Sequence, residues 1–338
     1  MKKIFTLAAA VTMLWSCSKE DSILTPDENE TASLQIETTV LSRVSRATKV
    51  ENGNTTVTGP VLGTELPNGS KIGVTVYNVG TTSNYQGLAD SVSNNLLWTA
   101  NESKWTPAKP FYLQNRGADI YGYFPYNAEA KNMFAIPVAP GYVDYLRGKS
   151  SNSVSKVNPS AAIVMDHALA MISFTFQRTN YPGECKLQAI TLNNLPNAGT
   201  MNLTNGAITT ADTKASFNVL HYNGTNYAGD NWSNITIPAN GILGTVNSAP
   251  SNVVTTAPAF HALVLPATDL PSDTATLNAS IVIDGATYTV ALNIISGGND
   301  WLPAKHYSYN LTLKGKDLVV SSVSVTQWTE GGFSDIEI

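Results

Sequence analysis

The 338-residue chain has little charge and only four histidines. Charged residues make up 13% of it, and 25 acidic against 20 basic side chains leave a net charge of −5 with no cluster of lysine or arginine. A surface that binds a phosphate backbone needs concentrated positive charge, so we expect no nucleic-acid partner. The histidines (His167, His221, His261, His306) are scattered, and none lies at ligand spacing from a cysteine or another histidine. The sequence therefore predicts no metal site.

Motifs that carry catalysis are also lacking. The chain has no GxSxG elbow, no phosphate-binding Walker loop and no dinucleotide fingerprint. Asp166 and His167 are adjacent, but neighbours on a strand point to opposite faces, so they would not orient one another. Cys185 has no histidine near it in sequence, which favours a small strand-edge residue over a nucleophile. We predict a protein without catalytic residues or cofactors.

After the first few residues, no long segment shows a sustained helical period. Threonine, serine, asparagine and glycine are abundant, and short alternating apolar runs recur from Lys71 onward. Asn205-Gly206 and Asp284-Gly285 each separate two such runs and predict type I′ hairpin turns. The pattern is typical of an all-β protein, and its simplest form is two Greek-key sandwiches.

The N-terminus has the order of an export signal. Lys2 and Lys3 precede an apolar stretch from Ile4 to Trp15, followed by Ser16 and Cys17. Leu14-Trp15-Ser16-Cys17 resembles the bacterial lipobox, in which the cysteine is acylated and the signal is then removed. The stretch is shorter than the ~20 residues of a membrane span. We expect residues 1–16 to be a lipoprotein signal peptide and Cys17 to carry a lipid anchor; the other reading is an ordinary secretory signal.

A polar, acidic tether at 17–31 is expected to precede the first strand. In that strand Leu34, Ile36 and Val40 alternate with polar residues, so we expect these side chains to fill a groove of their own domain. We expect the strand itself to pair with a neighbouring strand on both sides. Arg43 and Arg46 follow in a small, polar setting that favours cleavage. Residues 148–159, rich in serine, asparagine and lysine, are predicted to link an N-terminal domain (32–157) to a C-terminal domain (158–338).

The ordered set of motifs resembles the fimbrillin family, the lipoprotein-derived subunits of type V pili. After the lipobox and Arg46-Ala47-Thr48, the set comprises Gly69-Ser70-Lys71-Ile72-Gly73-Val74, Tyr121-Gly122-Tyr123-Phe124-Pro125-Tyr126, His167-Ala168-Leu169-Ala170 and Trp301-Leu302-Pro303-Ala304-Lys305-His306-Tyr307.

The resemblance implies two transthyretin-like domains and assembly by strand exchange. An arginine-specific protease would cut after Arg46, or after Arg43, and remove the lipidated first strand. A neighbour's strand would then fill the groove, with Val319, Val323, Val325 and Trp328 as the candidate donor. The implied partners are other pilus subunits, and the implied location changes from a lipid-anchored precursor in the outer membrane to a surface fimbrium that serves cell adhesion. Stalk and tip roles stay open.

A second reading is a non-polymerising surface lipoprotein that binds glycans through aromatic platforms. Its stacking candidates are Trp98, Trp105, Tyr121, Tyr123, Phe124 and Tyr126. Packing of these rings in the core is the alternative that we favour.

Overall fold

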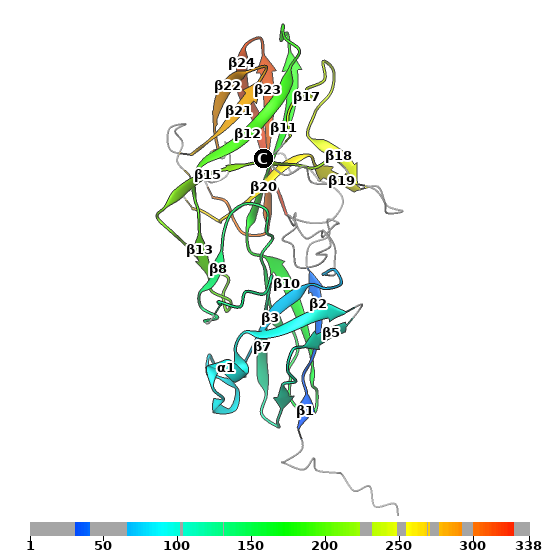
Figure 1. Cartoon of the computed structure of the whole chain (residues 1–338), viewed down its shortest axis with the longest axis vertical. Coiled ribbons are helices and arrows are strands. Elements are labelled where there is room, and N and C mark those ends of the chain that lie inside the picture. The colour runs from blue at the N-terminus through cyan, green and yellow to red at the C-terminus, as the bar shows by residue number, and fades with distance from the viewer. Residues whose placement is uncertain are drawn as a thin grey trace, which may run out of the picture.

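The structure is a computed structural model that describes residues 31–40, 66–101, 104–130, 132–223, 232–248, 255–268, 270, 277–292 and 300–327. Its strands form two lobes along the long axis of the molecule (Figure 1). Helical structure in these ranges is confined to a single 3-10 turn, η1 (Tyr85–Gly87), and a four-residue helix, α1 (Asp90–Ser93). Neither is long enough to cross a bilayer. The predicted all-β class is confirmed.

One seven-stranded sheet forms the lower lobe in Figure 1. Its order is β2 (Gln35–Val40), β10 (Ser160–His167), β9 (Leu146–Ser150), β7 (Ala118–Phe124), β3 (Lys71–Asn78), β4 (Leu96–Asn101) and β5 (Lys104–Pro107). Only the β2–β10 pair is parallel; the other neighbours are antiparallel. A short antiparallel pair, β1 (Ala32–Ser33) with β6 (Tyr112–Leu113), precedes β2.

The upper lobe is a sandwich of two five-stranded sheets. The first has the order β16 (Leu220–His221), β20 (Phe260–Val264), β11 (Ala170–Thr179), β23 (Lys305–Lys314) and β24 (Asp317–Gln327). The second has the order β15 (Lys214–Asn218), β12 (Lys186–Pro196), β21 (Asn278–Ile283) and β22 (Ala286–Ala291), with β17 (Ile235–Thr236) also paired to β12. A hairpin of β18 (Thr245–Ser248) and β19 (Thr255–Pro258) stands apart.

Burial explains which strands alternate and which do not. Along β10, buried and half-buried residues alternate strictly, as expected for a strand with one face on a core. β3 and β7 are instead buried almost throughout. Their Val74 and Ile120 face the core of the lower lobe, whereas Tyr77 and Tyr121 face a separate core at the junction. Because both faces of these two strands are covered, burial does not alternate along them.

A hydrophobic core joins the two lobes. It contains Tyr77, Tyr121 and Tyr123 from the seven-stranded sheet together with residues of β11, β20 and the hairpin strand β13 (Gly199–Met201), including Met171, Met201 and Leu263. Beside it, β13 pairs with β14 (Ile208–Thr210) on one side and with β8 (Ile136–Val138) on the other. Gly141 and Leu263 also exchange backbone hydrogen bonds of 2.8 and 3.0 Å. The lobes are therefore packed and hydrogen-bonded to each other.

Residues 148–159 do not separate the two lobes, in contrast to our expectation. They contain the end of β9 and the turn into β10, and both strands belong to the seven-stranded sheet. The chain passes to the other lobe at Ala168 and Leu169, between β10 and β11. A polar, serine-rich segment here is a turn within a sheet. The two-domain, transthyretin-like Greek-key description stays a prediction.

The two predicted hairpins differ in their turns. Asp284 (φ 47°) and Gly285 (φ 80°) form the two-residue connection expected between β21 and β22. At the predicted Asn205-Gly206 turn, Met201 pairs with Ile208, so the loop is longer than two residues. Of Asn205 and Gly206, only Gly206 (φ 77°) has a positive φ. A side chain at Gly206 would overlap the guanidinium of Arg147 on β9. This glycine therefore allows close approach between the lobes.

Gly206→Ala is expected to weaken the junction. Both Gly206 and Gly285 would force alanine into the left-handed region, but only at Gly206 would the new methyl group meet another side chain. We expect Gly206→Ala to lower the free energy of unfolding by about 1–3 kcal/mol more than the matched control Gly285→Ala. Denaturant unfolding of both variants measures the difference. Equal losses would show that Arg147 moves aside without cost.

Candidate functional site

The first strand lies in a hydrophobic groove of the lower lobe. Leu34 is fully buried, and Ile36 and Val40 are 4% and 1% exposed. All three pack in a core with residues of β3, β7 and β10, among them Ile72 and Ile163. Their polar neighbours Gln35 and Glu37 are exposed. The alternation read from the sequence thus matches the observed burial of this strand.

The backbone of β2 forms a ladder on one side. It runs parallel to β10, from Gln35 opposite Ser160 to Val40 opposite Met165. Within the described residues its other edge has no strand ladder and faces β5, where Trp105 Nε1 donates to Thr38 Oγ1 at 3.0 Å. Pairing on both sides, as expected from the sequence, is therefore found only at the start of the strand, where Leu34 N donates to Phe111 O at 2.8 Å beside the β1–β6 pair, and not along β2. The alternation of apolar residues along a strand predicts which side chains are buried. It does not predict how many neighbouring strands are hydrogen-bonded to the backbone.

The candidate donor segment is the outer strand of the upper lobe's first sheet. β24 pairs with β23 along its whole length, and Val323 and Val325 pack partly buried against the sandwich core. Val319 does not share their face: it is 41% exposed, and Leu318 and Val320 face the core instead. A bulge causes the change, because Val320 pairs with Leu311 while Ser322 pairs with Asn310, which leaves Ser321 as an extra residue.

Four other predicted positions, Cys17, Arg43, Arg46 and Trp328, lie outside the described residues. Arg43 and Arg46 belong to the segment 41–65, which connects β2 to the described chain that resumes at Leu66. The lipid anchor and the cleavage site therefore stay predictions.

The buried histidines have structural surroundings. His167 Nδ1 lies 2.9 Å from Asp144 Oδ2, with both side chains 1% exposed, and the adjacent Asp166 faces away toward Arg147. His306 Nε2 lies 2.7 Å from Ser173 Oγ inside the upper lobe. Burial, and next the charge of His261, lowers the pKa of His306 to about 3. No substrate reaches a serine–histidine pair in such a position, and the described residues hold no group of three metal-ligating side chains.

Cys185 is buried in the upper lobe, where its backbone N–H donates to Asp284 Oδ2 at 2.8 Å. Burial is the main cause that raises the pKa of its thiol. A protonated, enclosed thiol is a poor nucleophile. This agrees with the structural role expected from the sequence.

The aromatic platform of the glycan-binding reading is not present. Trp98 and Tyr123 are 1% exposed and Tyr121 is 7% exposed, so their rings cannot stack on a sugar. Trp105, Phe124 and Tyr126 are half-buried. Core packing, the alternative that we favoured, is observed for the three buried rings. A polar surface surrounds the loop after β3 and was not predicted from the sequence. The asparagines, serine and threonines of this loop are the sequence feature that could have indicated it.

The fimbrillin-like family model matches residues 48–328. A Bacteroides uniformis structure, of a protein proposed to act in cell adhesion, is 16% identical with a TM-score of 0.57 over 90% of this chain and 100% of that one. A Bacteroides ovatus structure with the same proposed role is 14% identical with a TM-score of 0.58 over 90% and 100%. At such identities these structures show a shared fold. A comparison with curated proteins gave no match. Because the family match covers most of its length, the chain belongs to the fimbrillin-like family.

Proposed function

We propose that this protein is a pilus subunit that is exported as a lipoprotein, loses its first strand by proteolysis and assembles by strand exchange. Family membership supports the coarser part of this statement, a non-enzymatic pilus subunit in a cell-surface fimbrium. The finer steps are lipidation at Cys17, cleavage after Arg46 or Arg43, and donation of a strand by a neighbour. They rest on the sequence and on the position of β2.

One observation supports the exchange most directly: β2 is an edge strand with a fully buried apolar face and a ladder on one side. Removing it would uncover the core of the lower lobe and the backbone of β10, which is a template for another chain. Three buried aliphatic side chains are worth roughly 5–9 kcal/mol before ordering costs. Intact, β2 blocks premature pairing of the same groove.

The connection between β2 and the rest of the chain suits a single cut. Residues 41–65 contain both arginines, so one cleavage there leaves β1 and β2 attached only by side-chain packing and backbone hydrogen bonds. The family match begins at residue 48, just after Arg46. A family match that begins after the expected cleavage site supports a first strand that can be removed without loss of the body of the subunit.

β24 supports the donor role in part. It is the last strand described, it lies at a sheet edge, and apolar Val323 and Val325 alternate with Ser324 on one face. Donation would require β24 to leave β23 and to uncover part of its own core. This cost must be offset by the pairing and burial that β24 gains in the neighbour's groove.

N-terminal sequencing and intact mass of the protein from the cell surface test lipidation and cleavage together. We expect a mature N-terminus at Ala47 without lipid, or at Val44 if Arg43 is cut. We expect the precursor to carry acyl groups on Cys17. Cys17→Ala should leave the precursor in the aqueous phase of a detergent separation, because the lipid anchor is lost. The apolar stretch from Ile4 to Trp15 is shorter than the ~20 residues that a membrane span needs. Continued partition of that variant into detergent, or a surface form with the first strand attached, would contradict the proposal.

A further inference from the structure

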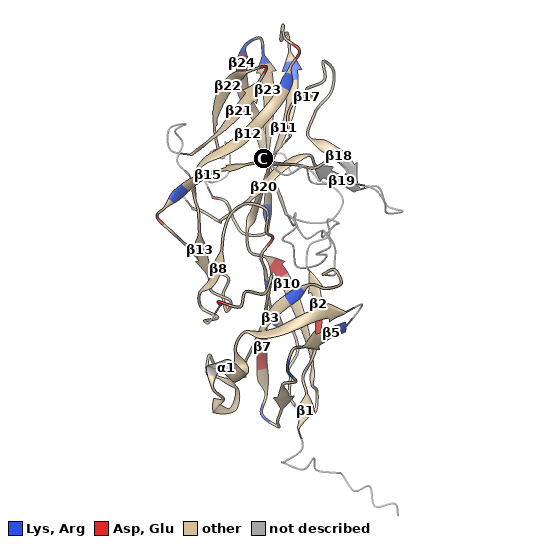
Figure 2. Ribbon diagram, in the orientation of Figure 1, with Lys and Arg blue, Asp and Glu red and all other residues tan. Residues whose placement is uncertain are grey.

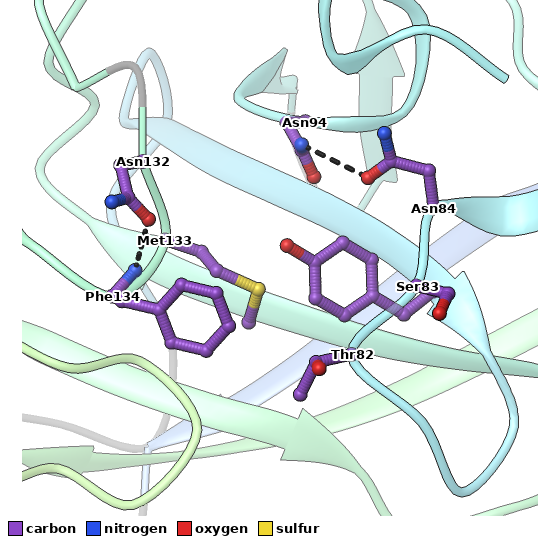
Figure 3. A pocket seen from close by; sticks show the side chains of 8 residues that line it. Thr82, Ser83, Asn84, Asn94, Asn132, Met133 and Phe134 are labelled. Carbon is purple, nitrogen blue, oxygen red and sulfur yellow. Dashed lines mark hydrogen bonds between the residues drawn. The ribbon is translucent and has the colours of Figure 1, made fainter. Parts of the chain in front are cut away.

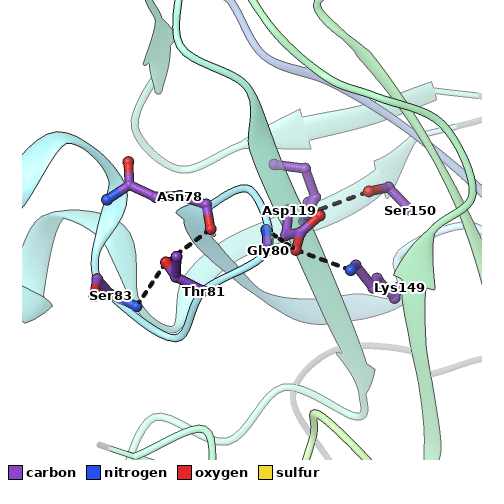
Figure 4. Close-up of polar contacts among 8 residues, drawn as sticks. Asn78, Gly80, Thr81, Ser83, Asp119, Lys149 and Ser150 are labelled. Carbon is purple, nitrogen blue, oxygen red and sulfur yellow. Dashed lines mark hydrogen bonds and ion pairs between the residues drawn. The ribbon is translucent and has the colours of Figure 1, made fainter.

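The loop that follows β3 is fixed by a network of asparagine side chains. Asn78 Nδ2 donates to the backbone oxygen of Asn84 at 2.9 Å, and Asn78 Oδ1 accepts from Gln86 N at 3.1 Å. Asn94 Nδ2 donates to Asn84 Oδ1 at 3.2 Å (Figure 3). Thr81 Oγ1 caps the same loop by donating to Asn78 O at 3.0 Å (Figure 4). The loop is therefore held in place before any ligand arrives.

Two open hollows adjoin on this loop. The first, of about 520 Å³, is lined by the aromatic and sulfur-containing side chains Tyr77, Met133 and Phe134 and by Asn84, Asn94 and Asn132 (Figure 3). The second, of about 540 Å³, is lined by Asp119, Tyr121, Lys149 and Thr204 (Figure 4). Thr82 and Ser83 belong to both. The rings of Tyr77 and Tyr121 meet edge to face beneath them, with centroids 6.4 Å apart.

The charges of this surface are neutralised by each other. Lys149 and Asp119 are the only charged residues among the linings, and Lys149 Nζ lies 2.9 Å from Asp119 Oδ2. That oxygen also accepts from Gly80 N at 3.0 Å, and the ammonium lies 5.4 Å from the centre of the Tyr121 ring. Charged residues elsewhere are spread along both lobes (Figure 2). An anionic polymer would find no excess of positive charge here.

The backbone around the hollows is also satisfied. On one side β3 pairs with β7 as far as Asn78; on the other its pairing with β4 ends at Val74, and the loop itself covers the rest of that edge, where Asn78 N donates to Ser83 O at 3.0 Å. The other edge of β7 is covered by β9 and, beyond it, by the hydrogen bond from Ala118 N to Val154 O at 2.8 Å, so no strand edge is open to an added peptide strand at this place. What the surface offers is amide and hydroxyl groups that both donate and accept, beside one exposed ring, Phe134 at 40% exposure. Such groups match the vicinal hydroxyls of a sugar, whose C–H face packs on an aromatic ring.

We infer that this double hollow binds a neutral oligosaccharide. Phe134 would supply the stacking face, and Asn132 the amide, whose Oδ1 accepts from the backbone N–H of Phe134 at 2.9 Å (Figure 3) and whose Nδ2 would be the donor to the sugar. The hollows are open, so each site binds weakly, and repetition along a fibre multiplies the affinity. The inference rests on the proposed function only for this repetition, because the site is complete in a single uncut chain.

The uncut full-length protein is tested on an array of neutral and sialylated oligosaccharides, and affinities are then measured in solution. We expect a neutral oligosaccharide to bind, and Phe134→Ala to weaken it about tenfold, as loss of one aromatic contact does. Asn132→Asp keeps the acceptor for Phe134 N and removes the amide donor, so we expect a loss of about three- to tenfold.

Tyr112→Ala is the matched control. Tyr112 is an aromatic residue 56% exposed on β6, outside both linings, and its loss should change the affinity less than about twofold. Three results would overturn the inference: no neutral oligosaccharide bound, binding that both hollow variants retain, or binding restricted to sialylated chains and abolished by Lys149→Gln. Circular dichroism of each variant verifies the fold. Since the uncut chain is used, failure here leaves strand exchange untouched.

Discussion

Protein cut after Arg46 is expected to form oligomers whose size rises with concentration, whereas uncut protein stays monomeric. The cut leaves β1 and β2 in place, held by the ladder to β10 and by Leu34, Ile36 and Val40. Release is therefore slow, since roughly 5–9 kcal/mol of burial opposes it. Size-exclusion chromatography after digestion with an arginine-specific protease follows the change. A synthetic peptide of residues 31–41 in excess should refill the groove and halt growth.

Controls lie in the same segment. Arg43→Ala with Arg46→Ala should prevent both cutting and assembly, and Lys49→Ala, which removes a basic residue but no arginine, should prevent neither. A donor-deleted protein lacking Val319–Ile338 should still accept a strand and thereby terminate the growth of full-length chains. Because β24 covers part of its own core, circular dichroism must first show retained β-structure. Strand-free protein that stays monomeric at every concentration would refute the exchange.

Acid is expected to destabilise the upper lobe through His306. Burial and the neighbouring His261 lower the pKa of His306 from 6.5 to about 3. Below pH 6.5, His306 is therefore protonated in the unfolded chain, whereas in the folded chain it stays neutral down to about pH 3. The contribution of this histidine to stability is complete above pH 6.5 and declines as the pH falls toward 3, by on the order of 5 kcal/mol.

Unfolding free energies measured between pH 7 and pH 3 test this sign. His306→Gln keeps a polar partner for Ser173 without a titrating ring, so its stability should fall less steeply with acid than that of the unmodified protein. His221→Gln is the comparison, because burial alone lowers the pKa of the half-buried His221. Identical slopes for the protein and His306→Gln would show that folding does not lower the pKa of His306.

Sequence patterns predicted those parts of the fold that depend on one exposed and one buried face. Leu34, Ile36 and Val40 were identified because β2 has such faces. β3 alternates in sequence through Ile72, Val74 and Val76 although the junction core covers its second face, whereas β7 is an aromatic-rich run without that alternation. The bulge at Ser321, which turns Val319 outward, depends on the register with β23, and nothing within β24 itself specifies it.

The candidate sites divide in the same way. A strand that fills a groove has a local signature, whereas the double hollow is assembled from β3, β7, β9 and three separate loops that only the fold brings together. Residues 148–159 misled for a related reason: polar composition marks exposed chain, and it does not distinguish a turn within a sheet from a link between lobes.

The shared core and the β8–β13 pairing have a mechanical meaning for a subunit in a fibre. Tension applied between the groove of one lobe and the outer strand of the other must pass through this junction. Because Met201, Leu263 and Tyr121 are packed there and β8 is hydrogen-bonded to β13, the two lobes cannot rotate independently of each other. Each subunit would therefore transmit tension as a rigid body. Extension of the fibre would then occur mainly at the exchanged strands between subunits.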